Sequence, residues 1–223
     1  IGEVRDLTQF TKVVEFNDIA ALEAALAPGD VACVLAEPIM TNVGMVLPDE
    51  GYHDALRTIT RKHGTLLILD ETHCMSSGPG GYTKAHGLEP DGLVLGKPIA
   101  GGIPAAVYGF SAPAAQRIAK FLETRTPGHS GIGTTLSGSK IQLALIRTVL
   151  ESYFTSEAFA PLIALAKMLE KGISDVIGEY ALPWHVVRVG ARVEFMCTPE
   201  RPRNGGEAAR LIHRPVDQAV HHY

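Results

Sequence analysis

The chain has 223 residues, enough for one large domain or one and a half, and its 46% hydrophobic content supports a sizeable core and argues against disorder. The formal charge of −4 and the lack of a basic run give no sign of nucleic-acid binding. Because no apolar run approaches the roughly 20 residues that span a bilayer, and no signal peptide is recognisable, we expect neither membrane insertion nor secretion.

Strands and helices alternate from the first residues onward. Strands are predicted at 12–16, 31–37, 65–70, 91–97 and 105–110, and helices at 18–27, 48–64, 112–123 and 137–154. Apolar residues at helical spacing after Asp18, an expected N-cap, and the stop at Gly64 are typical helix signals. This alternation predicts an α/β fold with a mainly parallel sheet over residues 1–154.

The pattern changes from about Thr155. A long helix is predicted over 156–178, followed by short strands at 185–189 and 192–196 and a weakly helical tail. We interpret residues 155–223 as a linking helix and the start of a smaller α+β domain. Since the first residue is Ile1 and not Met, we expect the chain to be part of a longer protein, incomplete at both ends.

Lys97 follows a buried strand and opens the Gly-rich turn GKPIAGGIP. An amine held there is favourably placed for partial desolvation, which promotes imine formation with an aldehyde. A loop lysine that covers the strand end is the alternative interpretation. A phosphate-binding P-loop is excluded, because the spacing from Gly92 to Gly96 is too short and Pro98 occupies the place of its Ser or Thr.

Asp70 ends a second apolar strand, LLILD, upstream of Lys97. Both side chains can face one crevice at the rim of a parallel sheet, where α/β proteins bind ligands. Pyridoxal phosphate needs two such groups: a lysine that forms an imine with its aldehyde, and an acid that keeps its ring nitrogen protonated. The alternative is a strand-end Asp that caps the turn after it.

From about residue 13 to residue 151 the chain resembles class III pyridoxal-phosphate aminotransferases, and most closely their glutamate-1-semialdehyde aminomutase branch. The motifs behind the resemblance are EP....G at Glu37, DE at Asp70, PD..LGK.I.GG.P ending at Pro104 and TLSG at Thr135. The resemblance implies the large domain of the fold-type I enzymes. It also implies a homodimer whose active sites lie at the subunit interface.

By this resemblance, Lys97 is the Schiff-base lysine and Asp70 is the partner of the cofactor's ring nitrogen. Thr135 matches a threonine that binds the cofactor phosphate in the neighbouring subunit, and a hydroxyl before a helix N-terminus suits an anion. An ordinary N-cap for the following helix is the alternative for Thr135. Glu37 and Asn42 match family positions near the substrate and the cofactor.

Two positions just after Asp70 depart from the family pattern. Relatives carry Val and then Gln or Met where this chain has Thr72 and His73. Thr72 takes the place of the residue that packs on the cofactor ring. His73 is either a hydrogen-bond partner of the phenolic oxygen, which would tune imine basicity, or a packing residue. The family's upstream phosphate loop, stacking aromatic and C-terminal segment are absent from these 223 residues.

These observations predict an aminotransferase that moves an amino group between an amino acid or amine and a keto or aldehyde acceptor. Lys97 would carry a proton as general base and then as general acid. A 2,1-aminomutase, a racemase and a decarboxylase use the same cofactor and stay open. A truncated or degenerate non-catalytic subunit is the third hypothesis, and we expect the isolated chain to be inactive because half the pocket is missing.

The partners implied are a small-molecule amino donor, a keto or aldehyde acceptor and a second copy of the chain. Three widely spaced cysteines favour a reduced, cytoplasmic location. No metal site is expected, because the tail histidines, His213 among them, lack acids or cysteines at ligand spacing.

Overall fold

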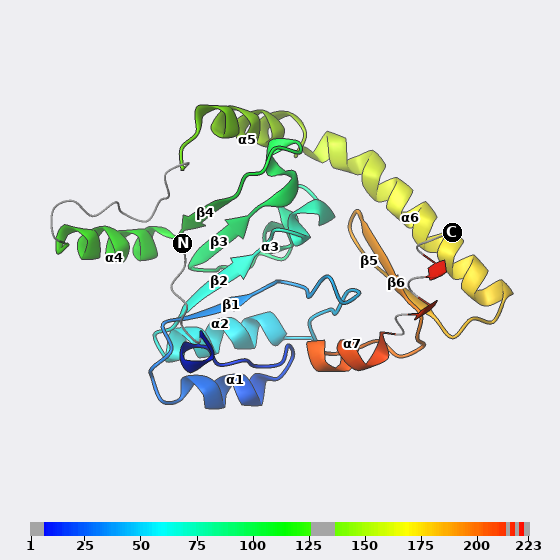
Figure 1. Cartoon of the computed structure of the whole chain (residues 1–223), viewed down its shortest axis with the longest axis horizontal. Helices are drawn as coiled ribbons and strands as arrows, with labels where there is room; N and C mark the ends of the chain where they lie inside the picture. The colour runs from blue at the N-terminus through cyan, green and yellow to red at the C-terminus, as the bar shows by residue number, and fades with distance from the viewer. Residues whose placement is uncertain (1–6, 126–136, 213–214, 217–218, 221–223) are drawn as a thin grey trace.

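A four-stranded sheet lies at the centre of the computed structural model, which describes residues 7–125, 137–212, 215–216 and 219–220 (Figure 1). The strand order is β1 (Cys33–Ala36), β2 (Leu66–Asp70), β3 (Gly92–Leu95) and β4 (Val107–Phe110). The first three strands run parallel, and β4 is antiparallel to β3. The predicted α/β fold with a mainly parallel sheet is confirmed.

Helices surround this sheet and link its strands. They are α1 (Ile19–Leu26), α2 (Tyr52–Lys62), α3 (Gly81–Ala85), α4 (Ala112–Glu123), α5 (Lys140–Ser152), α6 (Ser156–Glu179) and α7 (Gly205–Leu211). Three short 3₁₀ turns accompany them: η1 (Leu7–Phe10), η2 (Cys74–Ser77) and η3 (Lys97–Ala100). Local signals set several of these boundaries, since Asp18 Oδ1 accepts a hydrogen bond from the Ala21 amide at 2.8 Å at the start of α1.

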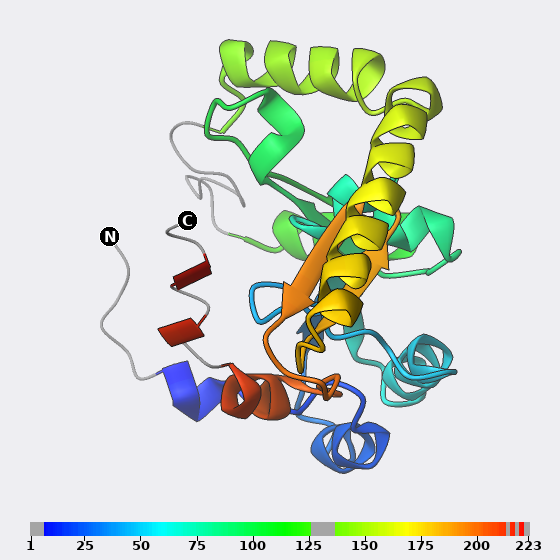
Figure 2. The ribbon, with the colours of Figure 1, turned by 90° about the vertical axis from the view of Figure 1, so that its right-hand side faces the viewer.

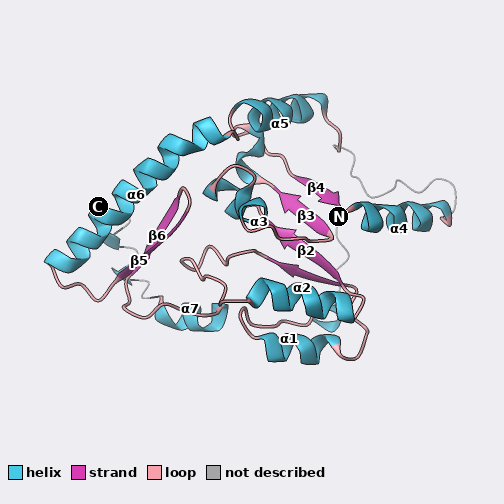
Figure 3. Ribbon diagram, turned by 180° about the vertical axis from the view of Figure 1, so that it is seen from behind, coloured by secondary structure: helices cyan, strands magenta, loops and turns pink. Residues whose placement is uncertain are grey.

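The first core lies on one face of the sheet. α2 packs Leu56 and Ile59 against Leu67 and Leu69 of β2, and α1 lies beyond α2 (Figures 1 and 3). These side chains are nearly inaccessible to water, so their burial supplies much of the stability of this layer. Because β1, β2 and β3 are parallel, their carboxyl ends lie at one rim of this layer.

The strand predicted at 12–16 is wrong. The segment is irregular, and the side chain of Val13 is 91% exposed. Lys12 Nζ instead donates hydrogen bonds to the carbonyl of Ala25 and to Asp30 Oδ1, at 3.2 and 2.6 Å. An apolar run becomes a strand only where a neighbouring strand accepts and donates its ladder bonds, and within the described residues none does so here.

The C-terminal part consists of α6 and a two-stranded hairpin of β5 (His185–Val189) and β6 (Arg192–Met196). α6 runs alongside this hairpin (Figures 1 and 2). α7 returns to the N-terminal segment, where Ala208 joins the first core. The domain boundary at 154/155 stays a prediction. Within the described residues, no helix combines the length and apolar character that crossing a membrane requires.

Two smaller cores fix the turn that follows β2. Cys74 packs with Ile39, Met45, Tyr82 and Val187. Its neighbour Met75 packs in a separate cluster with Ile99, Ala100 and Ile146. Because adjacent residues of η2 are buried in different cores, the backbone between Asp70 and η2 has little freedom to shift.

Candidate active site

The carboxyl ends of β1, β2 and β3 bring three predicted site residues to one rim of the sheet. Glu37 directly follows β1, Asp70 is the last residue of β2, and Lys97 opens η3 after β3. Asp70 is paired in register with Val94, three positions before Lys97. The rim of parallel strands is the usual ligand position in open α/β sheets.

Asp70 keeps one oxygen available for a ligand. Its Oδ1 accepts a hydrogen bond from the Thr72 amide at 2.9 Å, which is the turn-capping role considered as an alternative. Oδ2 accepts no hydrogen bond from any described residue. The carboxylate is therefore oriented by its own turn, and its second oxygen can meet a donor.

Lys97 has an unusual backbone conformation. Its φ of +50° lies in the left-handed region, which residues with a Cβ adopt at a cost of about 1–3 kcal/mol. Strain of this kind is concentrated at functional positions. The side chain is exposed, so the described part of the chain does not supply the desolvation expected of a reactive amine.

Thr72 lies between these two residues. A Cβ built on Gly96 would come within 3.3 Å of both Thr72 Cγ2 and Thr72 Oγ1. The Thr72 side chain therefore packs on the backbone that leads into Lys97. This contact joins the end of β2 to the start of η3.

His73 is connected to Glu37 through Thr41. The Thr41 hydroxyl lies 2.6 Å from both His73 Nδ1 and Glu37 Oε2, and the Thr41 amide donates to the same Oε2 at 2.8 Å. Burial lowers the pKa of His73, and the cations of Lys97 and Arg192 lower it further, against Glu37 and Asp70. Neutral imidazole is favoured at this position.

Arg192 is a site residue that the sequence analysis missed. From β6 it donates hydrogen bonds to the His73 carbonyl at 3.5 Å and to Ser76 Oγ at 3.3 Å. It also pairs with Glu194 at 2.8 Å. Arg192 reaches the His73 turn because it begins β6, directly after the two-residue loop of the hairpin. No local sequence pattern could have indicated this contact.

Glu71, the neighbour of Asp70, faces away from the rim. Its side chain is 1% exposed, and its carboxylate accepts the amides of Tyr82 and Thr83 at the start of α3. Burial raises the pKa of this carboxyl. The two acids of the DE motif therefore have different positions: Glu71 accepts amides at the start of α3, while Asp70 ends β2 at the rim.

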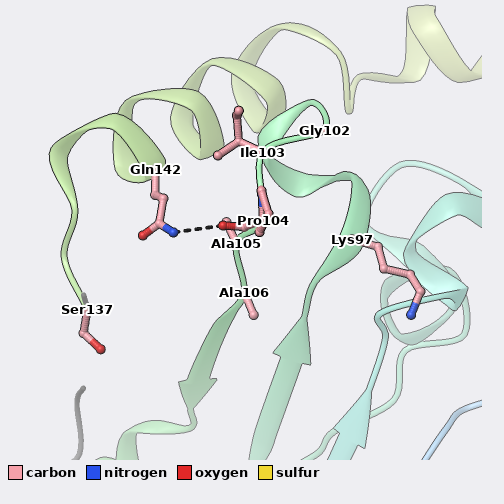
Figure 4. Close-up of a pocket in the computed structure, with 8 residues that line it drawn as sticks. All are labelled: Lys97, Gly102, Ile103, Pro104, Ala105, Ala106, Ser137 and Gln142. Atoms are coloured by element: carbon pink, nitrogen blue, oxygen red, sulfur yellow. Dashed lines mark hydrogen bonds between the residues drawn. The ribbon is translucent and has the colours of Figure 1, made fainter. Parts of the chain in front are cut away.

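A cavity of about 670 Å³ lies beside η3 (Figure 4). Gln142 of α5 donates to the Pro104 carbonyl at 2.9 Å across it, and Ser137 lines the same side. Figure 4 shows the Lys97 amine pointing away from Gln142 and Ser137. The cavity is therefore adjacent to the lysine rather than centred on its amine.

The structure does not connect the two remaining predicted residues, Asn42 and Thr135, to the others. Asn42 is exposed, with φ of +65°, in the loop closed by the bridge between Met40 and Val46. No hydrogen bond joins it to Asp70 or Lys97. Thr135 lies outside the described residues; the N-cap position of α5 is Ser139. The described side chains form no cluster of His, Cys, Asp or Glu able to hold a metal ion.

The fold and the strand-end residues define a class, and comparison with known proteins agrees. The model of the family Aminotransferase class-III matches residues 4–221. The chain therefore belongs to the class III aminotransferase family, as its motifs predicted.

Individual relatives are similar over most of the chain. The glutamate-1-semialdehyde 2,1-aminomutase of Sulfurihydrogenibium azorense is 32% identical over 200 residues, which is 88% of this chain and 45% of that protein. A crystal structure of a glutamate-1-semialdehyde-aminomutase variant from Pseudomonas aeruginosa PAO1, in complex with PMP, is 53% identical with a TM-score of 0.85, covering 90% of this chain and 45% of that one. An omega-transaminase from Sphaerobacter thermophilus is 27% identical with a TM-score of 0.74, covering 88% and 44%.

The chain thus spans less than half the length of the relatives that it matches.

Proposed function

We propose that the whole protein is a pyridoxal-phosphate-dependent aminotransferase acting between an amino acid or amine and a keto or aldehyde acceptor. One observation carries the proposal: Asp70 ends β2, Lys97 opens η3 just after the adjacent parallel strand β3, and Lys97 is held with a positive φ. An acid and an amine so arranged are the two groups that this cofactor requires. The PMP named for the Pseudomonas structure supports the same cofactor class.

The residues present suit the cofactor. Asp70 would hold the protonated ring nitrogen through its Oδ2, Lys97 would bond to the aldehyde, and Thr72 and His73 would lie beside the ring. Thr135, by resemblance, would bind the phosphate. When bound, the cofactor supplies an electron sink for the substrate carbon.

The protein's own groups then move protons. The Lys97 amine would accept a proton from the substrate carbon and later return it. The Asp70 carboxylate would accept the hydrogen bond of the protonated ring nitrogen. A cytoplasmic location is part of the proposal, supported by a cysteine content of only three, at widely spaced positions in the sequence.

A glutamate-1-semialdehyde 2,1-aminomutase is the second candidate, because the Sulfurihydrogenibium relative and the Pseudomonas structure both carry that name. The two activities share their proton transfers. They differ in whether the amino group leaves on one molecule and arrives on another, so the substrates separate them.

The deciding experiment is a donor and acceptor panel on the whole purified protein, with absorbance recorded first. Imine absorbance followed by amino transfer to an added keto acid supports the aminotransferase. Isomerisation of glutamate-1-semialdehyde without a second substrate supports the aminomutase. A protein that takes up no cofactor and converts nothing would instead be the non-catalytic subunit.

Replacing Asp70 with asparagine in the whole protein should reduce turnover by at least about a hundredfold while some cofactor is retained. A neutral amide does not stabilise the ring-nitrogen proton as a carboxylate does. The kcat and the bound cofactor are measured together. Asp175→Asn, the same change at an exposed acid on α6, is the matched control; near-normal turnover in Asp70→Asn would refute the assigned role.

We also propose a homodimer with shared active sites, in which Thr135 serves the partner's cofactor. Mixing a whole Lys97→Ala subunit with a whole Thr135→Ala subunit should restore activity, because one heterodimer site carries both changes and the other carries neither. The measurement is activity after subunit exchange, with each variant alone as control. Confirmed exchange without recovery would mean that Thr135 serves its own subunit.

A further inference from the structure

Three side chains from separate segments form one hydrogen-bonded chain at the rim. Glu37 follows β1, Thr41 begins the loop after it, and His73 follows β2. The Thr41 hydroxyl is the link, at 2.6 Å from the carboxylate and 2.6 Å from the imidazole Nδ1. Both contacts are short for hydrogen bonds, and Thr41 itself is buried.

The direction of the protons follows from the chemistry of the three groups. A carboxylate only accepts hydrogen bonds, so the single hydroxyl proton of Thr41 points to Glu37 Oε2. The hydroxyl then has only lone pairs to offer on its other side. His73 Nδ1 must therefore be the donor of the second bond, which places the ring proton on Nδ1.

We propose that Glu37 and Thr41 hold His73 in the Nδ1–H tautomer, so that its Nε2 presents a lone pair to an N–H or O–H donor of a molecule bound at the strand ends. The tautomer rests on the hydrogen bonds alone. The identity of the bound molecule rests on the proposed function, in which it is either the amino substrate or a protonated oxygen of the cofactor.

The surroundings keep this ring neutral and fixed. Burial is the main cause that lowers the pKa of His73. The cations of Lys97 and Arg192 lower this pKa further, against Glu37 and Asp70. Arg192 also binds the His73 carbonyl. Among the described residues Nε2 has no hydrogen-bond partner, so it is the ring atom left for a ligand.

This arrangement reverses the polarity expected from the family. A glutamine at the same position has an amide NH₂ that can donate to a phenolate oxygen. Neutral His73 with its proton on Nδ1 can only accept through Nε2. The chain thus favours a ligand group that carries its proton, such as an amine arriving as ammonium.

The tautomer can be read directly by long-range ¹H–¹⁵N correlation of the whole protein labelled with ¹⁵N-histidine. The His73 signals are assigned by their loss in His73→Asn. We expect a protonated-type resonance for Nδ1 and an unprotonated-type resonance for Nε2 in the cofactor-free protein at pH 7.5. The reverse pattern would overturn the proposal, whether or not the protein proves to be an aminotransferase.

Thr41 provides a matched pair of variants. Thr41→Ser keeps the hydroxyl, so the Nδ1–H pattern should persist. Thr41→Val keeps the shape but removes the hydroxyl, so the proton should redistribute toward Nε2. An unchanged tautomer in Thr41→Val would show that Glu37 and Thr41 do not set it.

Ligand binding is tested on the same sample in two arms, first with pyridoxal phosphate and then with an added amino substrate. Movement of the Nε2 resonance in the first arm assigns the donor to the cofactor, and movement only in the second assigns it to the substrate. No movement in either arm, while absorbance shows that cofactor is bound, would overturn the acceptor role. If the protein binds no cofactor, the proposed function and the proposed ligand of Nε2 are both contradicted. The tautomer of His73 is still decided by the resonances of the cofactor-free protein.

His73→Asn gives the functional counterpart. Its amide can still donate to Thr41 but offers nothing at the Nε2 position, so kcat/KM should fall about ten- to hundredfold. His73→Gln, whose longer side chain reaches that position with an oxygen, should retain more activity. Equal activity of His73→Asn and the unaltered enzyme would contradict the role.

Discussion

Lys97→Ala in the whole protein should abolish the cofactor adduct that borohydride reduces, and with it all measurable turnover. The side chain supplies both the amine that bonds to the aldehyde and the proton acceptor at the substrate carbon. Because both roles are lost, we expect kcat to fall by at least about 10⁴-fold. The measurement is peptide mass analysis after borohydride reduction, together with kcat.

The backbone at this position makes alanine a clean test. Alanine carries a Cβ like lysine, so the strain of the +50° φ angle is unchanged and the fold should be retained. Lys97→Arg keeps the cation without the reactive amine and should be equally inactive. Lys120→Ala, at an exposed position on α4, should keep the adduct. A reduced cofactor found on a lysine other than Lys97 would contradict the assignment.

The strand ends were predictable because their signals are local. The apolar runs that become β2 and β3 each stop at a polar residue, so Asp70 and Lys97 could be placed at one rim before any contact was known. The hairpin strands β5 and β6 and the helix α4 match their predicted ranges for the same reason. Periodicity and cap residues within one segment were sufficient.

The missed features depend on residues far apart in the chain. α3 has only five residues, and its first amides are satisfied by Glu71 rather than by a neighbouring cap. Thr41 gains its role only when the loop after β1 meets His73. Arg192 acts across more than a hundred positions. Such contacts are set by tertiary packing, which local patterns do not encode.

Arg192 is held at the site because the tip of the β5–β6 hairpin contacts η2. Val189 pairs with Arg192, so Gly190 and Ala191 form a two-residue loop, and φ is positive only at Gly190. This is the pattern of a type II′ turn, which favours glycine at its first position. The Ala191 amide donates to the carbonyl of Ser77 at 2.7 Å, which docks the tip on η2.

Gly190→Ala should undock this tip and destabilise the whole protein by about 2–4 kcal/mol, the range of severe steric changes. A Cβ at Gly190 would lie 1.9 Å from the Ser77 carbonyl oxygen. This backbone atom belongs to η2, which is anchored by Cys74 and Met75 in two buried cores, so it has little room to move aside. Because the same turn carries His73, kcat should fall as well. The measurements are the urea unfolding midpoint and kcat.

Gly87→Ala is the matched control for this prediction. Gly87 has nearly the same backbone angle, φ of +61° against +58°, but no atom lies within 4 Å of a Cβ built there. Its substitution therefore reports the cost of the left-handed backbone alone, about 1–2 kcal/mol. The excess loss in Gly190→Ala then measures the contact with Ser77. If both variants lose the same stability and keep full turnover, the hairpin tip does not hold the His73 turn in place.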